Sequence, residues 1–147
     1  MSTRLSHTPA DIIRWLLIDL GVGTEPEDEG DWPIYAGNEP NLPDPLIIVY
    51  DTSGITQGRI QRTGETVEHH GIQFQIRGVD YPTTWTKADE LRQVIDEQVK
   101  YSKLTVDDSK YTIHAITRQS GPIALGKEQG THRFLFTLNA IVSLCET

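Results

Sequence analysis

The segment of this chain that comes closest to a chemical motif is a glycine-rich stretch that begins at Gly121. It reads Gly-Pro-Ile-Ala-Leu-Gly-Lys through Lys127 and matches the first seven positions of a phosphate-binding P-loop. The eighth position does not match, because Glu128 stands where a Ser or Thr hydroxyl should bind magnesium, and its charge would repel phosphate. The residues that follow have the pattern of a strand, so no helix N-terminus would face the anion. We therefore predict a glycine-rich turn between two strands.

The histidines and the single cysteine form no metal-binding or catalytic pattern. His69 and His70 are adjacent, and adjacent residues of a strand point to opposite faces, so they are poorly placed to share one ion. Cys145 lies in a C-terminal tail with no base near it, and we interpret it as an incidental thiol. We expect no catalytic activity, no metal and no cofactor. The other histidines, which have no ligand spacing, are His7, His114 and His132.

The N-terminal segment carries the signals of a helix over residues 9–20. Thr8 is a good N-cap, and Pro9 suits the first helical position. Gly21 can end the helix in a left-handed conformation. The apolar face is broad because Trp15 widens it. Such a face must be covered, either by the sheet of the same chain or by a neighbouring subunit.

A second helix follows a strand in the middle of the chain. Residues 72–77 alternate between apolar and polar side chains, which predicts a strand with one buried face. Pro82 disfavours helix before it, so we expect Thr83 or Thr84 to cap a helix that runs to about Tyr101. The apolar stripe of this helix consists of Trp85, Ala88, Leu91, Ile95 and Val99.

Four further segments have the pattern of strands. Residues 46–50 are apolar on both faces, so we expect that strand to lie in the interior of a sheet. In a later strand, we expect Tyr111, Ile113 and Ala115 to share one face. The four segments are residues 34–36, 46–50, 111–118 and 131–144.

Residues 51–70 form the longest region without firm periodicity. Gly54, Gly58 and Gly64 punctuate it among polar residues. A loop this long is uncommon in a compact domain unless it is functional. Two interpretations remain open: an extended hairpin arm, or a segment that becomes ordered only when it binds something.

These elements together predict an α+β fold. We expect one mainly antiparallel sheet with two helices packed on it, plus a long loop or hairpin arm. A crossover from Ile76 through the second helix to Tyr111 would place one parallel pair inside that sheet. The 147 residues are the usual length of one domain, which we take to span residues 1–147.

The composition excludes several classes of protein. The net charge of -8 argues against sequence-specific binding of nucleic acid, which needs basic surface. No apolar run reaches the roughly 18 residues of a membrane span, and we expect neither membrane association nor a signal peptide. One cysteine cannot form an internal disulfide, which suits a reducing compartment.

Two kinds of surface are candidates for contact with a partner. The region from Thr24 to Trp32 is acidic; it is either a solvated connector or a surface that repels or orients a partner. Apolar side chains are the second kind, and Ile123 and Leu125 either anchor a partner or cover the open end of the sheet. The acidic candidates are Glu25, Glu27, Asp28, Glu29 and Asp31, and the apolar ones are Trp15, Ile123, Leu125 and Leu135.

Several pieces of the chain, taken in order, resemble the tail terminator (tail completion, minor capsid) proteins of long-tailed bacteriophages. The pieces are the N-terminal helix, Pro-Leu-Ile-Ile-Val-Tyr-Asp, Gly-Ile-Gln-Phe-Gln-Ile-Arg-Gly-Val-Asp-Tyr, the helix from Ala88 to Val99, Ser-Gly-Pro-Ile-Ala-Leu-Gly, and His-Arg-Phe-Leu-Phe-Thr-Leu-Asn-Ala. The resemblance covers nearly the whole chain. Residues 51–70 depart from the family pattern.

The resemblance implies a structural virion protein of the tail, assembled in the host cytoplasm. It implies a homo-oligomeric ring, usually of six subunits, at the head-proximal end of the tail tube. The ring would stop polymerisation of the tail tube protein and dock the tail to the head–tail connector protein, and DNA would pass through without sequence-specific binding. We expect the acidic candidates, with Arg59 and Arg62, to face the channel or the tube. The alternatives are another neck adaptor of the head-closure type, or a small enzyme or ligand-binding domain.

Overall fold

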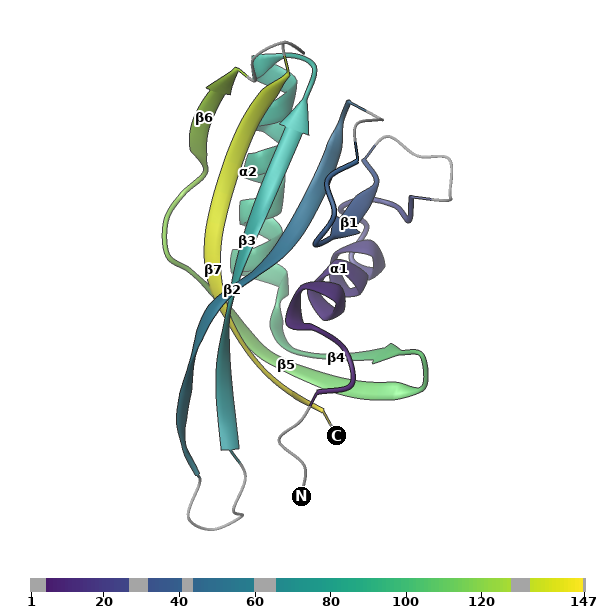
Figure 1. Cartoon of the computed structure of the whole chain (residues 1–147), viewed down its shortest axis with the longest axis vertical. Coiled ribbons are helices and arrows are strands. Elements are labelled where there is room, and N and C mark those ends of the chain that lie inside the picture. Colours follow the sequence, from purple (N-terminus) through teal and green to yellow (C-terminus); the bar gives the residue numbers. More distant parts are fainter. Residues whose placement is uncertain (1–4, 27–31, 41–43, 60–65, 128–132, 147) are drawn as a thin grey trace.

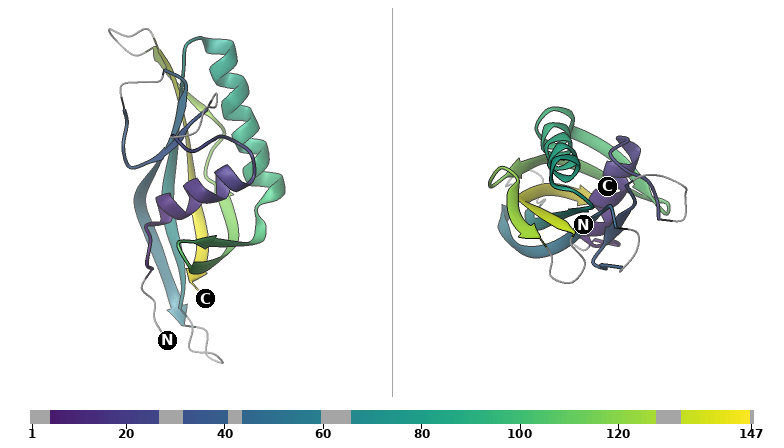
Figure 2. Two further views of the ribbon diagram at one scale, coloured as in Figure 1. Left: turned by 90° about the vertical axis from the view of Figure 1, so that its right-hand side faces the viewer. Right: turned by 90° about the horizontal axis from the view of Figure 1, so that it is seen from above.

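The computed structural model describes residues 5–26, 32–40, 44–59, 66–127 and 133–146. In this part of the chain, two helices pack on one face of a curled, mixed sheet, which gives an α+β architecture (Figure 1). Figure 2 shows both helices on the same side of that sheet. The elements are α1 (Pro9–Asp19), β1 (Ile34–Ala36), β2 (Leu46–Arg59), β3 (Thr66–Gly78), α2 (Tyr81–Gln98), β4 (Lys100–Val106), β5 (Ser109–Arg118), β6 (Ile123–Lys127) and β7 (Phe134–Glu146).

The strands lie in the order β1-β2-β3-β7-β5-β4, and β6 pairs with the first part of β7. The pair β1–β2 is parallel, and the other named pairs are antiparallel. The last strand of the chain therefore lies between β3 and β5. The predicted parallel pair between the strands of Ile76 and Tyr111 is wrong, because β7 lies between β3 and β5.

Helix α1 begins and ends close to its predicted limits. The side chain of Thr8 accepts a hydrogen bond from the N–H of Asp11, and Pro9 is in the first turn. The helix ends at Asp19, and Gly21 follows in the left-handed region with φ +81°. Five side chains of α1 are buried against the sheet: Ala10, Ile12, Ile13, Leu16 and Leu17.

Helix α2 begins earlier than predicted. Asp80, rather than Thr83 or Thr84, is the N-cap, and its carboxylate accepts a hydrogen bond of 2.8 Å from the N–H of Thr83. Pro82 lies inside the first turn, where backbone N–H groups have no hydrogen-bond partner within the helix, so its missing N–H costs nothing. The helix ends at Gln98, so Tyr101 belongs to β4 instead.

Two strands were not predicted. β4 forms a hairpin with β5 through Asp107 and Asp108, which both have positive φ, as a tight two-residue hairpin turn requires. β6 occupies most of the stretch predicted as a turn from Gly121, and it pairs antiparallel with β7. Neither strand is long or strongly apolar, so neither has a clear signal in the sequence.

A bulge changes the face assignment in β5. The register with β7 shifts between Ile113 and Ala115. Tyr111 and Ile113 are buried as predicted, but Ala115 is exposed and Ile116 is buried in its place. One extra residue in a strand moves all later side chains to the other face.

The central strands bury one face against the helices. Ile47 and Val49 of β2, Phe74 of β3 and Leu138 of β7 have no exposed surface. β2 lies between β1 and β3, which confirms the interior position predicted for residues 46–50.

β2 and β3 remain paired well below the rest of the sheet (Figure 1). Their register runs on from Thr52 opposite Gly71 to Arg59 opposite Thr66, with two irregularities. Residues 51–59 and 66–70 are thus strand, and residues 60–65 lie outside the described residues.

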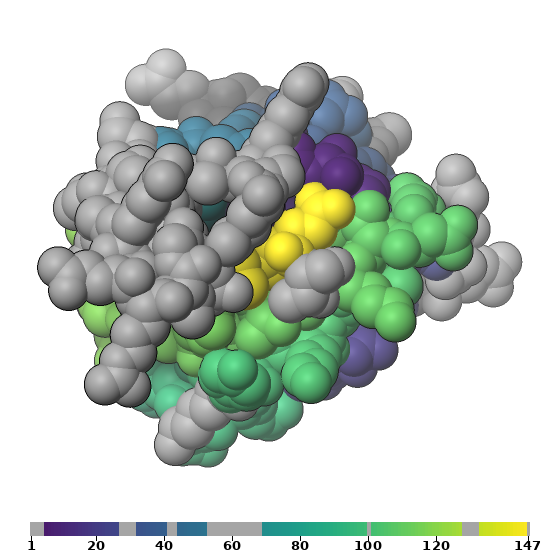
Figure 3. Space-filling view, turned by 90° about the horizontal axis from the view of Figure 1, so that it is seen from below, coloured from purple at the N-terminus to yellow at the C-terminus, as the bar shows by residue number. Residues whose placement is uncertain are grey.

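The two ends of the chain meet beside the β4–β5 hairpin. Ser6 donates two hydrogen bonds to the Glu146 carboxylate, at 2.8 Å from N and 3.0 Å from Oγ. His7 contacts the hydroxyl of Tyr111 through Nδ1, and burial raises the pKa of that tyrosine above 10.0. Seen from the end at which β2 and β3 project, the last part of β7 lies between this hairpin and the start of α1 (Figure 3).

Candidate interaction surface

Exposed apolar side chains concentrate around β6 and the start of α2. Among the described residues, the large apolar side chains that are exposed are Val79, Tyr81, Trp85, Tyr101, Ile123 and Leu125. We use the name β6 patch for Ile123 and Leu125 on β6, Tyr81 and Trp85 on α2, and Phe134 on β7. These side chains gather at one edge of the sheet but do not share one face: Ile123 lies opposite Thr137, whereas Tyr81 and Trp85 pack on the face that carries Phe136. Exposed apolar side chains grouped in this way are candidates for contact with another protein.

Aromatic contacts hold the first turns of α2 against β7. The Tyr81 ring lies 6.0 Å from that of Phe134 and 5.6 Å from that of Phe136, between centroids. The Trp85 ring lies 6.2 Å from that of Phe136. Pairs of this geometry contribute about 1 kcal/mol each beyond their burial. Lys127 of β6 adds a cation 6.0 Å from the Phe134 ring, so β6 and α2 meet at the same ring.

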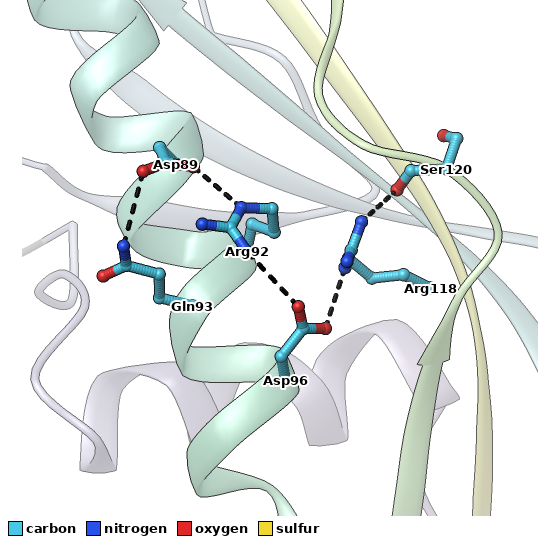
Figure 4. Close-up of polar contacts among 6 residues, drawn as sticks. All are labelled: Asp89, Arg92, Gln93, Asp96, Arg118 and Ser120. Carbon is cyan, nitrogen blue, oxygen red and sulfur yellow. Dashed lines mark hydrogen bonds and ion pairs between the residues drawn. The ribbon is translucent and has the colours of Figure 1, made fainter.

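An ion-pair network fixes the connection from β5 to β6 (Figure 4). Arg118, the last residue of β5, donates from Nε to Asp96 of α2 at 2.8 Å and from a terminal nitrogen to the carbonyl of Ser120 at 3.0 Å. On the other side of Asp96, Arg92 lies 3.5 Å from its carboxylate and also pairs with Asp89 at 2.7 Å. The hydrogen bond from Arg118 holds the pKa of Asp96 below its ordinary value of 3.8.

β6 itself is an edge strand. One side pairs with β7, from Ile123 opposite Thr137 to Lys127 opposite Phe134, and no described strand lies on the other side. All five of its residues are exposed, with exposed fractions of 43% for Ile123 and 53% for Leu125. These two side chains were predicted in a loop. They lie on a strand instead.

The other apolar candidates are less accessible. Trp15 is half-buried against the core, with the Arg14 guanidinium 4.8 Å from its ring centre. Leu135 is half-buried on β7, where Arg77 of β3 and Gly126 of β6 are its neighbours.

The structure describes little of the acidic candidate surface. Glu25 is half-buried next to Thr24, which forms an isolated parallel bridge with Pro33. Arg59 is the last residue of β2, where its backbone pairs with Thr66. The remaining charged candidates, which lie outside the described residues, are Glu27, Asp28, Glu29, Asp31 and Arg62.

Sequence reasoning missed the exposed aromatic side chains of α2. Trp85 was assigned to the buried stripe of the helix, but 43% of it is exposed, and Tyr81 was not assigned to the helix at all. A helical stripe alone gives the wrong burial for Trp85, whose ring lies against Phe136 of β7 while part of it stays in water.

Side chains that could take part in chemistry lie elsewhere, and those in the described part of the chain form no recognisable site. The expectation that no base lies near Cys145 is wrong, since the bulge residue His114 places Nε2 3.6 Å from its sulfur. His69 is hydrogen-bonded to Ser143 at 2.6 Å. The described residues contain no group of three or more side chains placed to bind a metal ion.

No helix within the described ranges is both long enough and apolar enough to cross a membrane. The longer of the two, α2, carries charged side chains such as Lys87 and Arg92 along its length.

Comparison with known proteins identifies the family. A family model described as bacteriophage tail terminator protein matches residues 16–144. No curated protein matches the chain significantly. The match runs from within α1 to two residues before the end of β7, and so includes every residue of the β6 patch. This chain belongs to the bacteriophage tail terminator family.

Proposed function

We propose that the protein forms a ring at the head-proximal end of the phage tail tube. The ring ends polymerisation of the tube and docks the tail to the head–tail connector. The observation that carries this proposal is the family match over residues 16–144, since the family is one of structural tail proteins. The ring contains six subunits, and each chain contributes a single domain spanning residues 1–147.

The exposed surfaces of the chain support assembly. The β6 patch leaves large apolar side chains in water, and such surface is stabilised by burial against another protein. A contact between two different surfaces of identical copies closes into a ring when the rotation between copies fits.

The charge of the chain suits a channel through which DNA moves. A net charge of -8 opposes the tight phosphate contacts of a DNA-binding protein. We place the acidic candidates around Glu25, together with Arg59 and Arg62, at the channel or at the tube-facing side. Charge reversal of Glu25, Glu27, Asp28 and Glu29 tests this placement. Unchanged ring assembly, tail length and infectivity would contradict it.

The assembly is tested by the mass of the protein in solution. Size-exclusion chromatography with light scattering is expected to show a species of six times the subunit mass of 16.5 kDa. A strict monomer at high concentration would count against a ring that forms without the tube.

The capping activity is tested on purified tail tubes. Tubes incubated with the protein are expected to carry a ring at one end and to stop elongating when free tube protein is added, as measured by length in electron micrographs. Bovine serum albumin at the same concentration serves as the control. Tubes that elongate equally in both samples would rule out the terminator role.

A further inference from the structure

The β6 edge exposes backbone groups as well as apolar side chains. Each residue of an antiparallel strand directs its N–H and C=O to one neighbour, and the next residue directs them to the other. Gln119 donates its N–H to the carbonyl of Asn139 at 2.9 Å, so Asn139 bonds toward the β5 and β6 side of β7. Thr137 then bonds toward Ile123, its partner on β6. The N–H and C=O of Ala124 consequently point away from β7.

β6 lacks the features that protect β4, another edge of the sheet, from pairing with a further strand. On β4, Tyr101 interrupts the strand with φ +53° and Lys103 is exposed, and both features discourage pairing with another strand. β6 carries no charge before Lys127, and its bulge lies only after Ala124. A short free edge therefore remains from Ile123 to Leu125, flanked by the aromatic rings of the β6 patch.

A second free edge lies on the opposite side of the same sheet. Ile47 donates its N–H to Pro33 at 3.0 Å, and Val49 accepts from Gly37 at 2.9 Å, so alternate residues of β2 bond toward β1. Asp51 is next in this series, and no described strand lies beside β2 there. β2 continues as strand to Arg59, with irregularities in its register with β3 between Thr52 and Ile55 and between Thr56 and Arg59, so its regular free edge starts at Asp51 and Thr52.

We propose that these two edges pair between copies of the chain: β6 of one subunit adds to the free edge of β2, beyond Tyr50, in the next. The inference rests on the proposed ring and names the contact that builds it. One subunit offers the β6 edge and receives a neighbour at its β2 edge, which is the head-to-tail arrangement that a ring needs. The sheet then continues from subunit to subunit, and the partner covers Ile123 and Leu125.

The registers fix a geometric consequence. Ile123 lies opposite Thr137, which lies opposite Gln75, which lies opposite Ile48. Leu125 precedes Gly126, which the same registers place at the level of Leu46. To bring Leu125 beyond Tyr50, the neighbour must be displaced along the strands by about five residues, or about 17 Å at roughly 3.4 Å per residue. The strands are accordingly inclined to the ring axis.

Disulfide trapping tests the pairing directly. In a Cys145→Ser background, Leu125→Cys combined with Thr52→Cys, an exposed position at the start of the free edge of β2, is expected to give, on oxidation, a ladder of covalent oligomers in denaturing gels. The matched control combines Thr52→Cys with Thr105→Cys, an exposed position on the protected strand β4, and is expected to stay monomeric in the gel.

A charged side chain on the edge of β6, which discourages pairing with another strand, tests the same contact without cross-linking. Leu125→Lys is expected to shift the mass in solution from that of the ring to 16.5 kDa, whereas Thr105→Lys leaves the ring intact. An intact ring in Leu125→Lys, with no ladder from the cysteine pair, would overturn the inference and leave the proposed function standing. A wild-type protein that is monomeric and fails to cap tubes would instead overturn the proposed function.

Hydrogen exchange of the wild-type protein gives a readout that depends on no variant. The amide of Ala124 is expected to exchange fast in the dilute monomer and slowly in the assembled ring. Equal exchange in both states would overturn the pairing.

Discussion

At the scale of single residues, two arginines hold loop segments against the helices and strands beside them. Arg118 joins the β5–β6 connection to α2 through Asp96. Arg77, which is 1% exposed, donates from Nε to the carbonyl of Asp44 at 3.0 Å and pairs with Glu39 at 3.3 Å. A planar guanidinium suits both tasks because it donates in several fixed directions at once. Arg118 thus holds the connection before β6, and Arg77 holds the connection before β2, where the buried Arg133 also pairs with Asp44 at 3.4 Å.

The Asp96–Arg118 pair makes a small contribution to stability that depends on pH. The folded pKa of Asp96 is depressed, so the contribution is fully present above the ordinary value of 3.8 and is lost as the pH falls through the lower folded value. Asp96→Asn is expected to lower the free energy of unfolding at pH 7 by no more than about 1 kcal/mol, because both side chains are partly in water.

Urea denaturation at pH 7 and pH 2.5 measures this effect. The difference between wild type and Asp96→Asn is expected to shrink at the lower pH, and Glu97→Gln, at the exposed neighbouring position, serves as the control. An equal loss at both pH values would show that the pair is not responsible.

At the scale of elements, the junction between β3 and α2 is set by one glycine. A Cβ on Gly78 would lie 2.1 Å from Oγ1 and 3.1 Å from Cβ of Thr84. Thr84 is fully buried, and its hydroxyl donates to the carbonyl of Asp80, so it has no room to move. Close approach of these two residues lets the helix begin directly above the end of the strand, with Tyr81 and Trp85 beside β7.

Gly78→Ala is therefore expected to destabilise the fold by about 2 kcal/mol, as overpacking of a tight contact does. Thermal or urea denaturation measures the loss. Gly121→Ala is the matched control, because a Cβ there meets nothing within 4 Å. In the double variant Gly78→Ala with Thr84→Ala, the loss of stability is expected to be smaller than the sum of the losses in the two single variants. Strict additivity would contradict the steric explanation.

At the scale of the whole molecule, stability and assembly are coupled through the proposed ring. A contact made only by the folded chain stabilises that chain by mass action. The Tm of the wild-type protein is therefore expected to rise with protein concentration. For Leu125→Lys, which places a charge on the free edge of β6, the Tm is expected to stay constant over the same range.

Differential scanning fluorimetry over a hundredfold range of concentration measures this dependence. Thr105→Lys is the control and is expected to behave as wild type does. A wild-type Tm that does not change with concentration, although light scattering shows the ring dissociating, would contradict the coupling.

The sequence by itself determined the parts of the fold that depend on local pattern. Helix α1 lies within one residue of its predicted range, since the cap at Thr8 and the glycine at position 21 act over a single turn. Residues 72–76 and most of the last strand alternate as predicted, because successive side chains of a strand point to opposite faces. Arg77 and Thr137 are exceptions, since both are buried although they were expected on the polar face. Leu125 and Ile123 were also recognised as partner candidates from their place beside Gly121.

Only the tertiary structure decided what depends on non-local pairing. β7 lies in the middle of the sheet, the bulge at His114 moves Ala115 outward, and β6 ends as an unpaired edge with Trp85 half-exposed beside it. None of these follows from the segment in which it occurs, because each depends on which strand lies alongside. The candidate residues Ile123 and Leu125 could be named from the sequence, but their position on an edge strand beside α2 is a property of the folded sheet.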